Sequence, residues 1–287
     1  MSRLYCLVAA VMLSALTIGS ASFAAPTDEY RFTLRPASDG KVQASFHRTD
    51  RSNHNWSSTF AASDLTGLAS SASGAPVRFA LVREAGRMDC VGEGSKDRAS
   101  GSCGFVPDAA FAAFLAEQGV RRPDSEEAFG MMALDVRREL VSALKAANFP
   151  TPDPDDLLAL TALNVTPAYI QGLAREGYRP RTLDELTQFA ALDISPDYIG
   201  GFVRAGYRDM KAEDLVQLKA LGITADYVRS FEQLGYGRLP ASELVQFKAL
   251  GVTPEFVRTA QQGRARRLTV DELTELRVVG FISRSRP

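Results

Sequence analysis

Histidine is nearly absent from this chain. Only His47 and His54 occur among 287 residues, and neither stands in the spacing of a zinc site. The sequence also has no His-Glu-x-x-His, Cys-x-x-Cys or Gly-x-Ser-x-Gly motif. A His-based zinc hydrolase is thereby excluded, and a serine nucleophile has no evident base. We therefore expect no catalytic residues, no bound metal and no cofactor.

Charge of one sign is also lacking. The chain carries 33 bases and 34 acids, a formal net charge of −1. Such a balance gives no global attraction for a polyanion. We expect no nucleic-acid partner.

Long apolar runs are missing after the first residues. One run follows Arg3 and leads into small residues, which is typical of a secretory signal peptide. We place this signal peptide at residues 1–24, because cleavage after Ala24 leaves Ser22 and Ala24 at the small-residue positions. No later segment approaches the roughly 20 apolar residues of a membrane span. The mature protein is expected to be periplasmic or secreted, and not transmembrane after signal cleavage.

Cysteine is scarce, with three in the chain. Cys6 leaves with the signal peptide, so Cys90 and Cys103 remain as an even pair in an oxidising compartment. If the segments Met88–Gly92 and Gly101–Val106 form a hairpin, the two cysteines lie opposite each other within bridging distance. We predict a disulfide between Cys90 and Cys103 that stabilises a small sheet.

Residues 25–106 alternate apolar and polar side chains between turn-forming segments, the pattern of a β-rich domain. The predicted strands are Tyr30–Arg35, Val42–His47, Trp56–Phe60, Val77–Arg83, Met88–Gly92 and Gly101–Val106. Residues 107–124 are predicted to form a short helix, with Asp108 as its N-cap, and a linker. Strands thus precede helices, which indicates an α+β fold rather than an alternating α/β fold.

The remainder, residues 125–287, follows a pattern that recurs every 29 residues. One column of this pattern holds Leu134, Leu163, Leu192, Leu221, Leu250 and Val279. A second column holds Leu157, Leu186, Leu215, Leu244 and Leu273, and a third holds Tyr169, Tyr198, Tyr227 and Phe256. A register maintained over so many residues indicates segments of equivalent structure.

Each copy of the pattern reads as two short helices. The first begins after an N-cap such as Thr166 or Ser195 and ends at a glycine such as Gly177. The second begins near a Thr-x-x-Glu capping box, as at Thr182, and ends at Asn, Asp or Gly, the last of them Gly280. One hairpin buries too little apolar surface to offset its backbone entropy, so neighbouring copies must stack. We predict an α-solenoid of two-helix repeats.

Two features of this array are candidate binding sites. The aromatic column, Tyr169, Tyr198, Tyr227 and Phe256, either lines a groove for a peptide or sugar or belongs to the core, the commoner place for aromatics at helical spacing. The segment 258–287 holds seven Arg and three acids, a net charge of +4. This basic end is either a solvated terminus or a surface that docks an acidic partner or an anionic membrane. Its candidate residues are Arg264, Arg266 and Arg267.

Two phrases of the array carry a family resemblance. Leu-Lys-Ala-Leu-Gly-Ile-Thr-Ala-Asp-Tyr-Val (Leu218–Val228) and Phe-Lys-Ala-Leu-Gly-Val-Thr-Pro-Glu-Phe-Val (Phe247–Val257) resemble repeats in extracytoplasmic regions of bacterial antirepressor membrane metallopeptidases of the β-lactam-sensor type. The segment Phe105–Asp108 is also similar, so the likeness extends over nearly the whole mature chain. This sequence lacks that family's multi-span membrane part and zinc motif, so no catalytic residue is carried over. The resemblance implies an exported sensing or docking module without the protease.

These observations predict an exported, non-enzymatic module that binds a protein or peptide partner in the cell envelope through its helical repeats. The alternative is a cell-wall binding protein, for glycan or peptidoglycan, or an enzyme whose site lies in the β-rich domain or at its junction with the first repeats. The residues considered for that alternative are His47, Trp56 and Asp108. Wall binding that is lost on Trp56→Ala would favour it.

Overall fold

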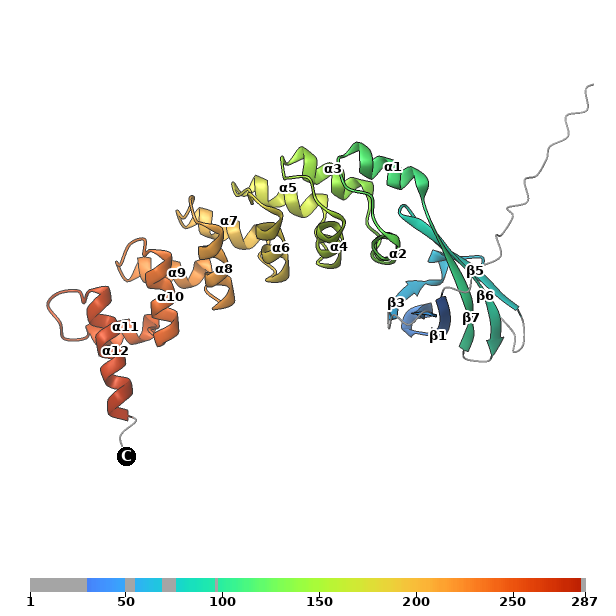
Figure 1. Cartoon of the computed structure of the whole chain (residues 1–287). Coiled ribbons are helices and arrows are strands. Elements are labelled where there is room, and N and C mark those ends of the chain that lie inside the picture. The colour runs from blue at the N-terminus through green and yellow to red at the C-terminus, as the bar shows by residue number, and fades with distance from the viewer. Residues whose placement is uncertain (1–29, 50–54, 69–75, 96–97, 285–287) are drawn as a thin grey trace, which may run out of the picture. The chain divides into compact units, whose positions relative to one another are not determined.

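The computed structural model describes residues 30–49, 55–68, 76–95 and 98–284, with side chains to Gly280 (Figure 1). The predicted signal peptide, residues 1–24, lies outside these ranges. Within the described residues an antiparallel sheet of seven strands is followed by twelve helices, so the fold is α+β as predicted.

The sheet has the strand order β3-β2-β1-β7-β6-β5-β4. Its strands are β1 (Tyr30–Pro36), β2 (Lys41–Arg48), β3 (Asn55–Ala61), β4 (Leu65–Thr66), β5 (Pro76–Arg83), β6 (Gly86–Ser95) and β7 (Arg98–Pro107). All six predicted strands are confirmed, because alternation and turn chemistry marked each of them. The two-residue strand β4 is too short to show alternation and was not predicted.

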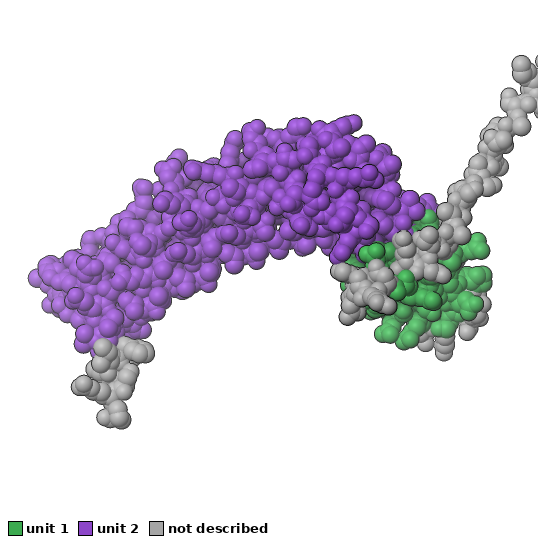
Figure 2. Space-filling view, viewed as in Figure 1, with its two compact units in different colours: residues 1–80, 89–104 green, residues 81–88, 105–287 purple. Residues whose placement is uncertain are grey.

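The chain divides into two compact units (Figure 2). Unit 1 consists of residues 1–80 and 89–104, and unit 2 of residues 81–88 and 105–287. In unit 1 the inward-facing rings of Phe32 and Phe79 meet edge to face, with centroids 5.0 Å apart, and both are buried. This contact is the centre of a small apolar core.

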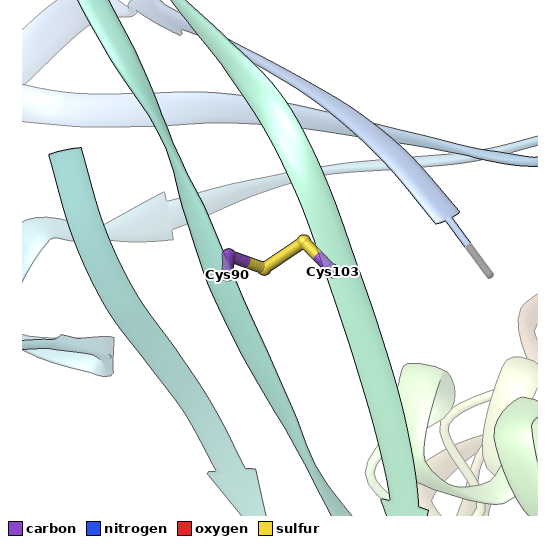
Figure 3. The surroundings of a disulfide bond; sticks show 2 residues. All are labelled: Cys90 and Cys103. Atoms are coloured by element: carbon purple, nitrogen blue, oxygen red, sulfur yellow. A yellow bond between two sulfur atoms is a disulfide. The ribbon is translucent and has the colours of Figure 1, made fainter. Parts of the chain in front are cut away.

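A disulfide within unit 1 joins Cys90 of β6 to Cys103 of β7, which are adjacent strands (Figure 3). The two Cα atoms are 4.1 Å apart, and both residues are fully buried. The predicted pairing is confirmed. Because the bond encloses only the β6–β7 hairpin, it stabilises that hairpin rather than the connection between distant segments.

The helices of unit 2 form the predicted repeats. They are α1 (Ala109–Glu117), α2 (Ser125–Leu134), α3 (Arg138–Ala146), α4 (Pro154–Ala162), α5 (Pro167–Arg175), α6 (Leu183–Ala191), α7 (Pro196–Arg204), α8 (Ala212–Ala220), α9 (Ala225–Gln233), α10 (Ala241–Leu250), α11 (Pro254–Gln261) and α12 (Val270–Arg284). Within the series α1, α3, α5, α7 and α9, each helix contacts its neighbours in the series. The same holds within the series α2, α4, α6, α8, α10 and α12. The array therefore has two layers, which appear as two rows in Figure 1.

The capping chemistry explains why the helices are so short and regular. The hydroxyl of Thr166 accepts from the backbone N–H of Tyr169, and the same bond recurs at Ser195, Thr224 and Thr253. At the other end of α5, Gly177 has φ +85°, and the N–H of Tyr178 donates to the carbonyl of Leu173 over 3.0 Å. This is the Schellman pattern that the sequence predicted.

The array begins one helix earlier than the sequence indicated. Helix α1 starts 29 residues before α3 and packs on it, so it is the first helix of the array rather than part of a connection between domains. Its N-cap Asp108 accepts from the N–H of Phe111 over 2.6 Å. The signal was weak because α1 has Phe111 in the column that holds tyrosine in later repeats.

The prediction that Gly280 ends the last helix was wrong. Helix α12 continues through Gly280 to Arg284, whereas Gly222 and Gly251 at equivalent positions have positive φ. Glycine permits the left-handed turn without requiring it, and inside a helix it costs only about 1 kcal/mol relative to alanine.

Candidate interaction surface of the helical array

The hydroxyls of the aromatic column join successive repeats. Tyr169 donates to the carbonyl of Ile194 over 2.8 Å, at the point where the next hairpin begins. Tyr198 and Tyr227 donate in the same way to the residues 25 positions ahead, Ile223 and Val252, over 2.8 and 3.1 Å. Each bond therefore ties the first helix of one repeat to the start of the next.

The rings of Tyr198, Tyr227 and Phe256 in this column are covered by cations from the following helix. The ammonium of Lys219 lies 5.1 Å from the ring centroid of Tyr198, and that of Lys248 lies 5.1 Å from the ring of Tyr227. These are favourable cation–π distances. Phe256 follows the same rule without a hydroxyl, since the guanidinium of Arg277 lies 5.2 Å from its ring.

Burial keeps the tyrosine hydroxyls protonated. It raises the pKa of Tyr169 and of Tyr227 to about 12 each, and it moves that of Tyr198 in the same direction. Protonated hydroxyls are what the carbonyl acceptors require. These contacts give the column a structural role at the joints between repeats, and its predicted role in ligand binding stays a prediction.

The arginines of the basic end also have partners within the chain. Arg264 donates through Nε to the carbonyl of Ala260 over 2.8 Å, and Arg266 pairs with Glu272, with one bond of 2.8 Å. The hydrogen bond from Arg266 lowers the pKa of Glu272 to about 2. Arg267 lies over the ring of Tyr236 at 5.7 Å. Docking of an anionic partner at this end stays a prediction, because these exposed cations already serve the fold.

Most of the leucine column reaches solvent, whereas Leu163 and Leu250 are half-buried and Leu250 packs against the core. Leu186 and Phe189 of α6 are fully buried, but Leu192 is 36% exposed. Leu134, Leu221 and Val279 at equivalent positions are 38%, 38% and 63% exposed. Apolar side chains from four different hairpins thus lie at one register position of the array and reach solvent.

The cations that cover the aromatic rings lie between these leucines. Lys219 donates to the carbonyl of Asp193, the residue after Leu192, over 2.5 Å. Lys248 is 3.5 Å from the carbonyl of Gly222, the residue after Leu221, and Arg277 donates to Leu250 itself over 3.0 Å. Apolar and cationic side chains therefore alternate along this edge. We call it the leucine–cation ridge, formed by Leu192, Lys219, Leu221, Lys248, Leu250 and Arg277.

The sequence contained a signal for this edge that was not used. Leu192 is six residues after Leu186, which places it about 240° around a helix of 3.6 residues per turn, away from the buried face. Lys219, Lys248 and Arg277 also recur every 29 residues. Combining the two periodicities would have identified the exposed edge.

The residues of the alternative site have structural partners of their own. His47 pairs with Asn55 across β2 and β3, with Nδ1 2.6 Å from Oδ1, and Trp56 stacks on Phe46 at 5.1 Å. Both belong to unit 1, whereas Asp108 caps α1 in unit 2. These contacts neither support nor exclude the alternative function.

Comparison of the sequence with protein-family models and with curated proteins gives no match in either case. Among the described residues, no group of three or more His, Cys, Asp or Glu side chains is arranged to hold a metal ion. No single described helix is long and apolar enough to cross a membrane; only α4 and α5 together, bent by 79°, pass that test of length and composition.

Proposed function

We propose that this chain is an exported interaction module that binds a protein or peptide partner through its helical array. The observation that carries the proposal is the leucine–cation ridge. Apolar side chains that reach solvent at repeated positions are a common mark of recognition surfaces, and solenoids use such extended surfaces for binding. A partner with apolar and acidic side chains would match the alternation along the ridge.

Two further observations support export. The disulfide between Cys90 and Cys103 is of a kind that persists in oxidising compartments. The first 24 residues have the pattern of a signal peptide. These two observations support the proposed periplasmic or secreted location, and the proposed partner is accordingly a component of the cell envelope.

Site-specific photo-crosslinking in the cell envelope tests the proposal. A photoreactive residue is placed at Leu221 on the ridge, and as a matched control at Gln217, which is exposed on the same helix α8. We expect a discrete crosslinked partner from position 221 and none from position 217. The crosslink should also disappear when Leu192 is changed to Asp in the same chain.

Equal crosslinking from the two positions would show nonspecific proximity and contradict the proposal. Absence of any crosslink from Leu192, Leu221 and Leu250 in cells that express the folded protein would also contradict it. Retention of the crosslink at position 221 in a Leu192→Asp chain would show that the ridge does not act as a unit.

A further inference from the structure

A second feature of the array lies outside the ridge. A cavity of about 210 Å³ opens between α3 and α5. Its walls are mostly apolar and include Ala143, Ala146, Ala147, Phe149, Ile170 and Ala174. Arg179 and Gln171 also line it and are exposed. A charged side chain thus borders an apolar space.

The next joint of the array shows what fills the equivalent space. Between α5 and α7, the carboxylate of Glu176 occupies the volume that a Cβ on Gly200 would need, and it pairs with Arg204 over 3.6 Å. One repeat earlier, the position of Glu176 is Ala147 and that of Gly200 is Gln171. The cavity therefore lies where one joint lacks the acidic side chain that the following joint has.

The loss of that acid leaves cations without acidic partners. Arg175 stands in the position of Arg204, but the residue it would pair with is Ala147. In the part of the chain that the structure describes, the side chains of Arg175 and Arg179 have no ion pair or hydrogen bond. An apolar space bordered by the unpaired guanidinium group of Arg179 is complementary to an apolar group that carries a negative charge nearby.

We propose that this cavity binds a peptide segment through one large apolar side chain and a carboxylate next to it. Apolar cavities of about 150 Å³ accept a benzene molecule, so the space suits a side chain of phenylalanine or leucine size. The carboxylate would pair with Arg179. The proposal involves none of the ridge residues and does not depend on the function proposed for the ridge.

A second cavity gives an internal comparison. It has the same register three repeats later, between α9 and α11, and measures about 280 Å³. Its lining includes Arg258, Gln261 and Arg267 in place of Gln171, Ala174 and Pro180, and it also includes Gln262. Because its walls are more polar and Arg258 is paired with Glu255, we expect this cavity not to respond to the same peptide.

Methyl NMR on the full mature chain tests the proposal, since four alanines line the cavity and Val257 reports on the comparison cavity. The probe is the peptide acetyl-Gly-Ser-Phe-Asp-Ser-Gly-amide, titrated to about 1 mM. We expect saturable shifts of the cavity alanine methyls and of Ile170, with Val257 unchanged. A peptide with Phe replaced by Ala should bind at least about tenfold more weakly, and a peptide with Asp replaced by Asn about two- to fivefold more weakly. A peptide ending in Phe, with a free or amidated carboxyl group, distinguishes a terminal from a side-chain carboxylate.

Two protein variants complete the test. Ala147→Glu with Gln171→Gly copies the Glu176 and Gly200 pair of the next joint, so it should fill the cavity and abolish binding while the fold is kept. Arg179→Glu should weaken binding about tenfold or more. Arg208→Glu, the matched change one repeat later, should leave binding unchanged.

Several results would overturn the proposal. These are an absence of shifts at about 1 mM peptide, equal binding of the Phe and Ala peptides, and full binding by the filled variant. Shifts of the cavity methyls on raising protein concentration without peptide would identify a second copy of the chain as the occupant, and would also overturn it.

Discussion

The hydroxyl of Tyr198 provides the sharpest test of how the repeats are joined. Tyr198→Phe removes the bond to the carbonyl of Ile223 but keeps the ring, its contact with Phe202 and the cation–π contact with Lys219. A typical hydrogen bond contributes about 0.5–1.5 kcal/mol, and a buried acceptor left without its donor costs about 1–3 kcal/mol. We expect the free energy of unfolding to fall by about 1–2 kcal/mol.

The loss should be local. In a stacked array each hairpin contacts only its neighbours, so the amides of α7 to α9 should exchange faster while those of α3 and α4 are unaffected. Urea unfolding of the oxidised chain gives the total change, and native-state hydrogen exchange gives its location. The exchange experiment is essential, because repeat arrays need not unfold in one step.

Two comparisons make the result specific. Tyr227→Phe, whose hydroxyl makes the equivalent bond to Val252, should behave like Tyr198→Phe. Phe256→Tyr should give no gain, because the residue 25 positions ahead lies inside α12 instead of following a helix end. Unchanged protection of α8 and α9 in Tyr198→Phe, or a loss spread evenly over the chain, would refute the joint that we describe.

Three further predictions concern other contacts. Cys90→Ala with Cys103→Ala should destabilise the β6–β7 hairpin by about 3 kcal/mol, measured as hydrogen exchange in β6 and β7; unchanged exchange in these two strands would contradict it. Asp108→Ala should cost about 1 kcal/mol and fray α1, because the N-cap is lost; retained protection of α1 would argue against this role. The hydrogen bond from Arg266 lowers the pKa of Glu272 to about 2. The stability that this hydrogen bond contributes is therefore fully present above the unfolded-state pKa of about 4.3 and is lost as the pH falls toward 2. NMR titration of the Glu272 carboxyl group in the folded protein should give the low value; a midpoint near 4.3 would contradict it.

Much of the fold could be predicted because it rests on local signals. Alternation and turn residues identified the strands, and the opposed positions of Cys90 and Cys103 followed from one hairpin. The hairpin repeats followed from caps such as Thr166 and from glycines such as Gly177, which act within a few residues of their own position. Such features depend on chain neighbours and are visible in one sequence.

The surface was harder to predict because each of its contacts depends on which residue the neighbouring repeat places opposite a given side chain. The acceptor of Tyr198 is 25 residues away, and the cation over its ring is in another helix. The apolar cavity exists because Ala147 stands where Glu176 stands one repeat later, a difference without effect on helix formation. Leu192 is apolar and yet reaches solvent, because its angle on the helix and not its residue type decides which face it lies on.

The central claim is that the leucine–cation ridge binds a partner. The most direct measurement is the affinity of the crosslinked partner, once purified, for the mature protein and for its Leu192→Asp, Leu221→Asp variant. Full burial of a leucine is worth about 1.5–3 kcal/mol, and burying the exposed third of two leucines is worth about 1–2 kcal/mol, so we predict a rise in Kd of about five- to thirtyfold with the free energy of unfolding unchanged. An affinity equal to that of the unmodified protein would contradict the claim.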